Sequence, residues 1–325
     1  MNLKNIDPRA HIIESQQFDE DFLREMFDVT KYMRNNETQL KDIMKDRHVT
    51  LLFYETSTRT RFSFEIAAQR LGASTTMTES ATEFSSVSKG ETLEDTIRVV
   101  SGYTDFIVMR HFEDNAAEQA HAISQVPIIN AGSGKSQHPT QALLDVYTIY
   151  DHFNKTENLN ITVVGDLARG RTVKSLVYLM AKFPNNVFHF VAPDNSRIDQ
   201  GIKDYLSEHN AEYHETDNLN DTLKVSDIVY MTRVQKERFG KNPKKLTEEE
   251  ETEYTRARDM YKIDKNNVNL IRKNGILLHP LPRVVEISSE IDHDHRAQYF
   301  KQARNGLHVR MALFKMMNDY NYGTK

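Results

Sequence analysis

The chain has 325 residues, enough for two domains of ordinary size, each with its own apolar core. Its 42 Lys and Arg and 47 Asp and Glu leave a net charge of -5, which argues against a broad basic surface for nucleic acid or an anionic membrane. The lack of cysteine excludes a disulfide framework, a thiolate metal site and a cysteine nucleophile. No stretch approaches the roughly 18 apolar residues of a membrane span, and the first residues lack the apolar core of a signal peptide. We therefore expect a soluble, cytoplasmic protein with a small-molecule ligand.

Short apolar runs alternate along the chain with stretches of helical periodicity, which is typical of parallel α/β units. In the first half, strands are predicted at residues 48–54, 105–109 and 126–130, and helices at 61–71, ending at Gly72, and around Leu143, Tyr147 and Tyr150. In the second half, strands are predicted at 160–164, 186–192, 227–231 and 275–278, with a helix on which Val173, Leu176, Val177 and Met180 share one face. The polar stretch 151–160 separates the two series. We expect an α/β fold of two doubly wound domains, each a mostly parallel sheet flanked by helices.

Residues 239–267 form the one clear shift in composition, with many charges and almost no core-forming side chains. The stretch is either a solvated charged face or a mobile loop near a binding site. Thr247 followed by Glu250 fits a capping box, which would make part of it an exposed helix.

The segment 55–61, with the sequence ETSTRTR, lies between a predicted buried strand and an amphipathic helix. Its hydroxyl groups and its two guanidinium groups, from Arg59 and Arg61, arrive where free N–H groups and the positive end of the helix dipole point. A simpler interpretation is that Ser57 or Thr58 only caps the helix, but a cap does not explain two adjacent arginines. The segment therefore predicts an anion site, most simply for phosphate.

The STRTR segment followed by SFE resembles the carbamoyl-phosphate signature shared by the aspartate and ornithine carbamoyltransferases. Residues 137–141, with the sequence QHPTQ, resemble the HPxQ element of that family and have Pro139 in the first turn of the following helix. Alone, such a histidine is more often a local cap or a packing residue.

The second half of the chain resembles the aspartate branch of the family. Residues 165–172 (GDLARGRT) match its GDLxxGRT element, with glycine spacing unlike a dinucleotide site, and residues 230–237 resemble its second amino-acid-binding element. Residues 279–283 read HPLPR, where ornithine enzymes usually carry a cysteine in second place. Two carboxylates of aspartate suit two planar guanidinium groups, and Arg171 and Arg233 supply one each. Taken alone, each arginine would more often be a surface residue.

The resemblance implies a role for each candidate residue. The carbamoyl phosphate site would consist of Ser57, Thr58, Arg59, Thr60, Arg110, His138, Gln141, the backbone carbonyls of Leu281 and Pro282, and Ser85 and Lys89. The catalytic residues would be Arg59, Thr60, Arg110, His138 and Lys89, with Thr60, Arg110 and His138 as oxyanion donors. The aspartate site would consist of Lys89, Arg171, Arg233 and Gln235.

The resemblance also implies an assembly and a division of the chain. Residues 85–92 resemble a loop that a neighbouring subunit inserts, so a homotrimer with shared active sites is implied, although a flexible surface turn would explain the same composition. Residues 1–150 with a last helix at 305–325 would bind carbamoyl phosphate, and 151–304 would bind aspartate. The stretch 239–267 occupies the place of a loop that closes over aspartate. No metal or organic cofactor is implied.

The implied reaction is the transfer of the carbamoyl group to L-aspartate, an early step of pyrimidine synthesis. Two alternatives stay open: transfer to another amine such as ornithine, or an inactive subunit that only scaffolds an assembly. The residues also leave open whether a regulatory chain is a further partner.

Overall fold

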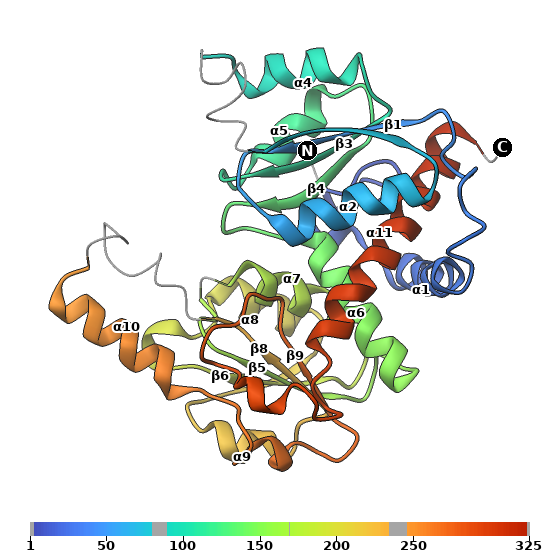
Figure 1. The fold of residues 1–325 in the computed structure, drawn as a ribbon. Helices are drawn as coiled ribbons and strands as arrows, with labels where there is room; N and C mark the ends of the chain where they lie inside the picture. The colour runs from blue at the N-terminus through green and yellow to red at the C-terminus, as the bar shows by residue number, and fades with distance from the viewer. Residues whose placement is uncertain (1–2, 80–89, 169, 234–245, 324–325) are drawn as a thin grey trace. The chain divides into compact units, whose positions relative to one another are not determined.

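Two compact units make up the chain, Met1–Tyr150 with Arg304–Lys325, and Asp151–Ala303. The structure, a computed structural model, describes residues 3–79, 90–168, 170–233 and 246–323. Each unit holds one parallel sheet with helices packed beside it (Figure 1), which confirms the predicted α/β fold. None of the helices in these described ranges is long and apolar enough to cross a membrane.

The sheet of the first unit has the strand order β2-β1-β3-β4, and all its pairings are parallel. Its strands are β1 (His48–Phe53), β2 (Ser74–Glu79), β3 (Phe106–His111) and β4 (Ile128–Ser133). Its helices are α1 (Glu20–Asn35), α2 (Thr58–Arg70), α4 (Leu93–Ser101), α5 (Ala116–Ile123), α6 (Pro139–Phe153) and α11 (Tyr299–Tyr322), of which α6 and α11 run past the limits of the unit. Every residue of β3 and β4 is buried, so both strands belong to the core of this unit.

The sheet of the second unit has the strand order β7-β6-β5-β8-β9, again all parallel. Its strands are β5 (Asn160–Val164), β6 (Val187–Val191), β7 (Glu212–Thr216), β8 (Ile228–Met231) and β9 (Ile276–Leu278). Its helices are α7 (Arg171–Met180), α8 (Gln200–Glu208), α9 (Leu219–Leu223) and α10 (Glu248–Met260). The order β6-β5-β8 means that the chain leaves β5 toward one side of the sheet and later returns to its other side.

The predicted elements differ from the observed ones mainly at their ends. Strand β5 has the predicted bounds, whereas α2 begins at Thr58, three residues before the predicted start, because the polar TRT segment is already helical. Strand β4 is displaced toward the C-terminus relative to the predicted 126–130. In the charged stretch 239–267, the described part contains α10 with the expected capping box: Thr247 Oγ1 accepts from Glu250 N at 3.2 Å, and Glu250 Oε2 accepts from Thr247 N at 2.8 Å. Residues 239–245 lie outside the described ranges.

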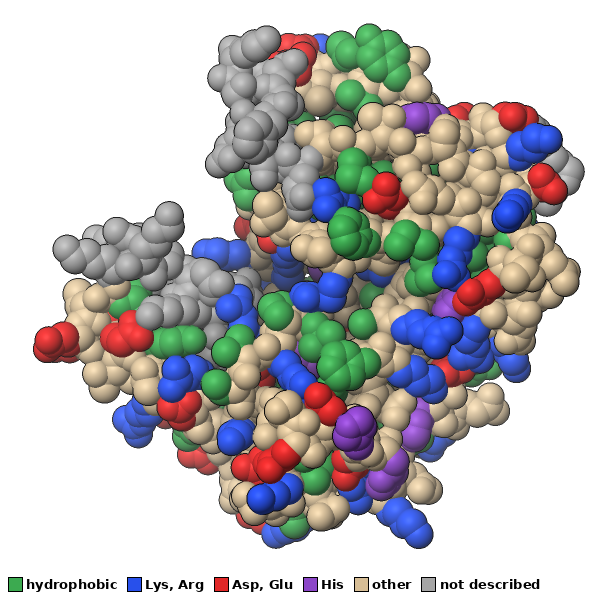
Figure 2. Space-filling model, viewed as in Figure 1, with side chains coloured by type: hydrophobic (Ala, Val, Ile, Leu, Met, Phe, Trp, Pro, Cys, Tyr) green, Lys and Arg blue, Asp and Glu red, His purple; other side chains and the backbone are tan. Residues whose placement is uncertain are grey.

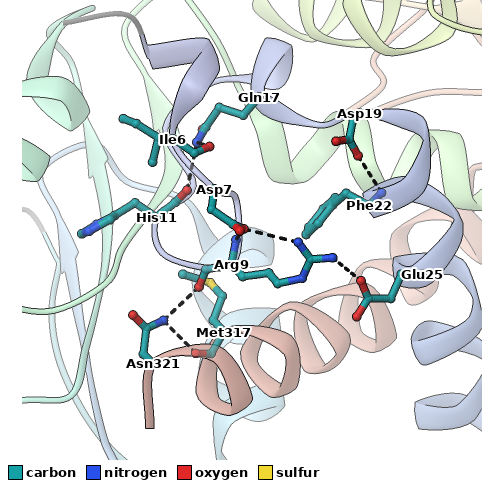
Figure 3. A network of polar contacts seen from close by, with 10 residues as sticks. All are labelled: Ile6, Asp7, Arg9, His11, Gln17, Asp19, Phe22, Glu25, Met317 and Asn321. Atoms are coloured by element: carbon teal, nitrogen blue, oxygen red, sulfur yellow. Dashed lines mark hydrogen bonds and ion pairs between the residues drawn. The ribbon is translucent and has the colours of Figure 1, made fainter. Parts of the chain in front are cut away.

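The last helix, α11, packs in the first unit and holds the N-terminal segment there (Figure 3). Asn321 Nδ2 donates to the backbone oxygens of Arg9, at 2.9 Å, and Met317, at 2.8 Å. The Arg9 guanidinium forms an ion pair with Glu25 on α1. The two ends of the chain therefore stabilise one unit, as expected of a C-terminal helix that returns to the first domain.

His11, in the same segment, makes the stability of this unit depend on pH. Burial, with a smaller contribution from the neighbouring His121, lowers the pKa of His11 from 6.5 to about 4. The folded state therefore keeps His11 neutral while the unfolded chain takes up a proton below pH 6.5, so stability is present above pH 6.5 and is lost as the pH falls toward 4.

We expect His11→Asn to reduce the fall in unfolding free energy between pH 6.5 and 4 by about 1–2 kcal/mol after allowance for solvent screening, because Asn has no group that takes up a proton there. The Asn side chain can still accept a hydrogen bond from Ile128 N, as His11 Nδ1 does at 3.1 Å. Urea unfolding at pH 7, 5.5 and 4 measures the effect. Equal pH slopes for the variant and the parent protein would contradict it.

Candidate functional site

The candidate residues of the first unit lie at or after the carboxyl ends of three neighbouring strands of its sheet. Ser57 to Thr60 come after β1, Arg110 lies near the end of β3, and His138 follows β4. Because the strands are parallel, their carboxyl ends meet at one edge, where ligands of open α/β sheets bind.

The N-terminus of α2 leaves its first N–H groups for a ligand. Ser57 is the N-cap residue in extended conformation, with φ -161° and ψ 96°, and its side chain makes no capping hydrogen bond. The capping interpretation is therefore wrong for Ser57. Thr60 is buried, and desolvation lowers the pKa of the Arg59 guanidinium, which stays positively charged at neutral pH. Backbone N–H groups, a hydroxyl and a cation are thus available together for an anion.

Arg110 is only 8% exposed although it carries a charge. Its Nη2 donates to Glu55 Oε1, and its Nη1 lies 3.5 Å from the carbonyl oxygen of Ala131. Its backbone oxygen accepts from Tyr54 N at 2.8 Å, which ties the end of β3 to the start of the 55–61 segment. The guanidinium is thus held beside the N-terminus of α2.

His138 and Gln141 lie at the N-terminus of α6, His138 directly before its first residue. The His138 carbonyl accepts from Gln141 N at 3.0 Å and from Ala142 N at 3.2 Å, with Pro139 as the first helical residue as predicted. His138 is 4% exposed, and the preceding turn is fixed by Gln137 Oε1, which accepts from Ser15 N at 2.7 Å. The start of α6 therefore has little freedom.

In the second unit, the candidate arginines follow neighbouring strands in the same way. Arg171 is the first residue of α7 after β5, and Arg233 follows β8; both are half-buried. Thr232 N and Thr232 Oγ1 each donate to Val164 O at 2.9 Å, so the backbone just before Arg233 is fixed to the end of β5. Two cations thus lie at the carboxyl edge of one sheet.

Gly165 permits this close approach of the two strand ends. Its φ is +121°, and a Cβ there would lie 2.5 Å from Thr232 Oγ1 and 2.6 Å from Thr232 O. We expect Gly165→Ala to destabilise the protein by about 2–4 kcal/mol, measured by urea unfolding. Gly201→Ala on α8 is the control, because its Cβ would come no closer than 3.4 Å to Asp199 Oδ1; it should be neutral or stabilising. Similar stabilities of the two variants would refute the argument.

The loop after β9 carries Leu281 and Pro282. Leu281 has φ +55°, and its N donates to His279 Nδ1 at 2.7 Å. His279 Nε2 lies 2.8 Å from Glu286 Oε1, and Glu286 Oε2 accepts from Val284 N at 3.1 Å. Burial raises the pKa of the Glu286 carboxyl, but the hydrogen bond with His279 and the backbone N–H groups lower it more, so its pKa lies below its ordinary value. The carbonyls of this loop are therefore held by a buried polar pair.

Three predicted site residues, Ser85, Lys89 and Gln235, lie outside the described residues. Within the described ranges, no three His, Cys, Asp or Glu side chains come together as a metal site. Figure 2 shows acidic and basic side chains on the same visible face of the molecule.

The sequence did not single out Glu55, Asp145 or Glu286 as part of the site. Asp145 carries a signal, because it stands four residues after Gln141 on one face of a helix. Glu55 stands two residues before the STRTR segment, but its pairing with Arg110 depends on the β1–β3 register. The pairing of Glu286 with His279 depends on a loop conformation that has no periodic signature.

Comparison with known proteins defines the class. Residues 10–151 match the family model described as aspartate/ornithine carbamoyltransferase, carbamoyl-P binding domain, and residues 157–317 match the Asp/Orn binding domain of the same family. The chain belongs to the aspartate/ornithine carbamoyltransferase family.

Relatives of this chain carry names from the aspartate branch of the family. The chain is 48% identical over 310 residues to the chloroplastic aspartate carbamoyltransferase of Arabidopsis thaliana, covering 95% of this chain and 77% of the other. It is 46% identical over 303 residues to the aspartate carbamoyltransferase catalytic subunit of Clostridium novyi, covering 93% and 96%. Among solved structures, the catalytic subunit of M. jannaschii aspartate transcarbamoylase superposes with a TM-score of 0.88 at 41% identity, covering 97% and 99%. The Trypanosoma cruzi enzyme in complex with carbamoyl phosphate and aspartate superposes with a TM-score of 0.87 at 34% identity, covering 94% and 96%.

Proposed function

We propose that this chain is the catalytic chain of an aspartate carbamoyltransferase, which converts carbamoyl phosphate and L-aspartate to N-carbamoyl-L-aspartate and phosphate. The observation that carries the proposal is that the described candidate residues lie at or after the carboxyl ends of β1, β3 and β4 in one unit and of β5, β8 and β9 in the other. Both family domains and the names of the relatives agree with it.

In this mechanism the phosphate binds at the N-terminus of α2. Ser57, Thr58, Arg59 and Thr60 donate to it through side chains and N–H groups, joined by Ser85 and Lys89. Gln141 and the carbonyls of Leu281 and Pro282 accept from the carbamoyl NH2. Arg171, Arg233, Gln235 and Lys89 bind aspartate.

The aspartate amino group attacks the carbonyl carbon, so a C–N bond forms and an electron pair moves onto the carbonyl oxygen. Thr60, Arg110 and His138 stabilise that oxyanion. The intermediate then collapses, the bond between the carbon and the phosphate oxygen breaks, and the departing phosphate takes the amine proton. Orientation of two charged substrates and electrostatic stabilisation provide most of the acceleration, with no metal or cofactor.

The test is an assay of the purified protein with carbamoyl phosphate and a panel of amines. N-carbamoyl-L-aspartate should form, with ornithine inert, because two arginines suit a dicarboxylate and a site for ornithine would need an acidic partner for the ammonium. Citrulline formation would favour the ornithine alternative. Binding of carbamoyl phosphate without any turnover would favour the inactive scaffold.

We further propose that the chain assembles as a homotrimer in the cytoplasm, with active sites shared between chains, and acts early in pyrimidine synthesis. The support for sharing is the resemblance of residues 85–92 to an inserted loop, and a cysteine-free composition is compatible with a reducing compartment.

Mixing two inactive assemblies tests the shared site. One is inactive through Lys89→Ala and the other through His138→Ala, and dissociation followed by reassembly together should restore part of the activity, because some sites then receive both native residues. Each assembly reassembled alone is the control. No recovery in a mixture of confirmed hybrid trimers would contradict the sharing.

A further inference from the structure

The carboxylate of Asp145 holds the amide of Gln141 on the buried side of α6. Gln141 Nε2 donates to Asp145 Oδ1 at 2.8 Å, one helical turn further on. A carboxylate can only accept hydrogen bonds, so the amide must present its NH2 group to Asp145. The amide oxygen is then directed to the other side, and it accepts no hydrogen bond from any residue in the described part of the chain.

Asp145 can do this because its charge is compensated inside the protein. Asp145 is completely buried, and the guanidinium of Arg310 on α11, 3% exposed, interacts with its charge. Burial lowers the pKa of Arg310 to about 10 while Asp145 raises it, so the Arg310 guanidinium is charged at neutral pH. A buried carboxylate without such a cation would be costly and would tend to take up a proton.

The packing of α11 on α6 keeps the Arg310 guanidinium in place (Figure 1). Asn305 Nδ2 donates to Thr148 Oγ1 at 3.0 Å. The Arg310 guanidinium lies over the Phe64 ring, 4.7 Å from its centroid, and a Cβ on Gly306 would lie 2.5 Å from Arg310 Nη1. All of these residues belong to the first unit, so the arrangement does not depend on the second.

We propose that Asp145 is a positioning residue: it fixes the Gln141 amide so that its oxygen, and not its NH2, faces the carbamoyl group. This rests on the proposed function, in which Gln141 contacts that group. The carbamoyl NH2 is a donor, whereas the methyl group of an acyl phosphate such as acetyl phosphate donates nothing. If the Gln141 amide were reversed, its NH2 group would face the carbamoyl NH2 group, and two hydrogen-bond donors would oppose each other. By preventing this, Asp145 makes the site select a carbamoyl group over an acetyl group.

The experiment compares two stable ligands that differ only at this position, phosphonoacetamide and acetonylphosphonate, by isothermal titration, with inorganic phosphate as the reference. The full chain should bind phosphonoacetamide about tenfold more tightly than acetonylphosphonate, as one hydrogen bond provides. In Asp145→Asn the new amide can either accept from Gln141 or donate to it, so this preference should fall to about threefold or less. The affinity for inorganic phosphate should stay within about twofold, because phosphate makes no contact with Gln141.

A double-mutant cycle separates positioning from a structural effect. Gln141→Met removes the amide, and adding Asp145→Asn to it should not change the preference further. The double variant Asp145→Asn with Arg310→Met removes the buried cation as well, so it leaves no uncompensated charge in the core. It therefore provides the same measurement of ligand preference if Asp145→Asn alone does not fold.

An unchanged preference in a folded Asp145 variant, or a further loss in the Gln141→Met background, would overturn the inference while leaving the proposed function intact. Failure of the parent protein to bind both phosphate and phosphonoacetamide would instead overturn the proposed function, and the inference with it.

Discussion

Replacing Arg110 by alanine should lower kcat by about a hundredfold to a thousandfold, which corresponds to about 3–4 kcal/mol of transition-state stabilisation. The guanidinium is 8% exposed and held by Glu55 and the Ala131 carbonyl, so it is already oriented before charge develops on the carbonyl oxygen. A donor fixed in this way requires no reorganisation during the reaction.

Arg98→Ala on α4 is the matched control for Arg110→Ala. The Arg98 side chain is 64% exposed and pairs with Asp95, three residues before it, so its loss should leave both kcat and stability nearly unchanged. Thermal unfolding of both variants separates loss of catalysis from loss of fold. A folded Arg110→Ala variant with kcat within about threefold of the parent value would contradict the oxyanion role.

Replacing Arg233 by alanine should raise the KM for aspartate by about tenfold to a hundredfold and leave the KM for carbamoyl phosphate nearly unchanged. A charge-assisted bidentate contact to a carboxylate contributes about 1.5–3 kcal/mol, and this contact belongs to one substrate only. The fold should persist, because Arg233 is half-buried and Thr232 carries the contacts to the end of β5.

Arg197→Ala provides the control for Arg233→Ala in the same unit. Arg197 pairs with Asp194 at 2.7 Å on the surface, so both KM values should stay near those of the parent protein. Steady-state kinetics with each substrate varied in turn gives the comparison. Equal increases in both KM values for Arg233→Ala would point to a general disturbance of the site and not to aspartate binding.

The sequence predicted the elements that have a strong apolar pattern. Strand β5 is an apolar run between polar residues, and its predicted bounds match the structure. The edge strands β2 and β7 were not predicted, because their sequences STTMTE and EYHET are polar and lack the apolar pattern of a strand. Pairing with a neighbouring strand, and not local propensity, makes these segments strands.

The candidate site was predicted at the level of motifs but not at the level of supporting contacts. STRTR, HPxQ and HPLP can be read from the sequence alone, because their residues are adjacent. The ion pair of Arg110 with Glu55 and the electrostatic interaction of Asp145 with Arg310 join segments that only the folded chain brings together. The pairing of Arg110 with Glu55 and of Asp145 with Arg310 has no local sequence pattern, which is why a sequence reveals the reacting groups before the groups that orient them.

The most direct test of the proposed carbamoyl transfer is to identify the bond that the enzyme forms. Carbamoyl phosphate labelled with 13C at the carbonyl and L-aspartate labelled with 15N are incubated with the protein, and the product is followed by 13C NMR. Transfer to the amino group of aspartate predicts a carbamoyl carbon signal split by one directly bonded 15N. Appearance of the 13C label only as bicarbonate, or in a product without that splitting, would contradict the account.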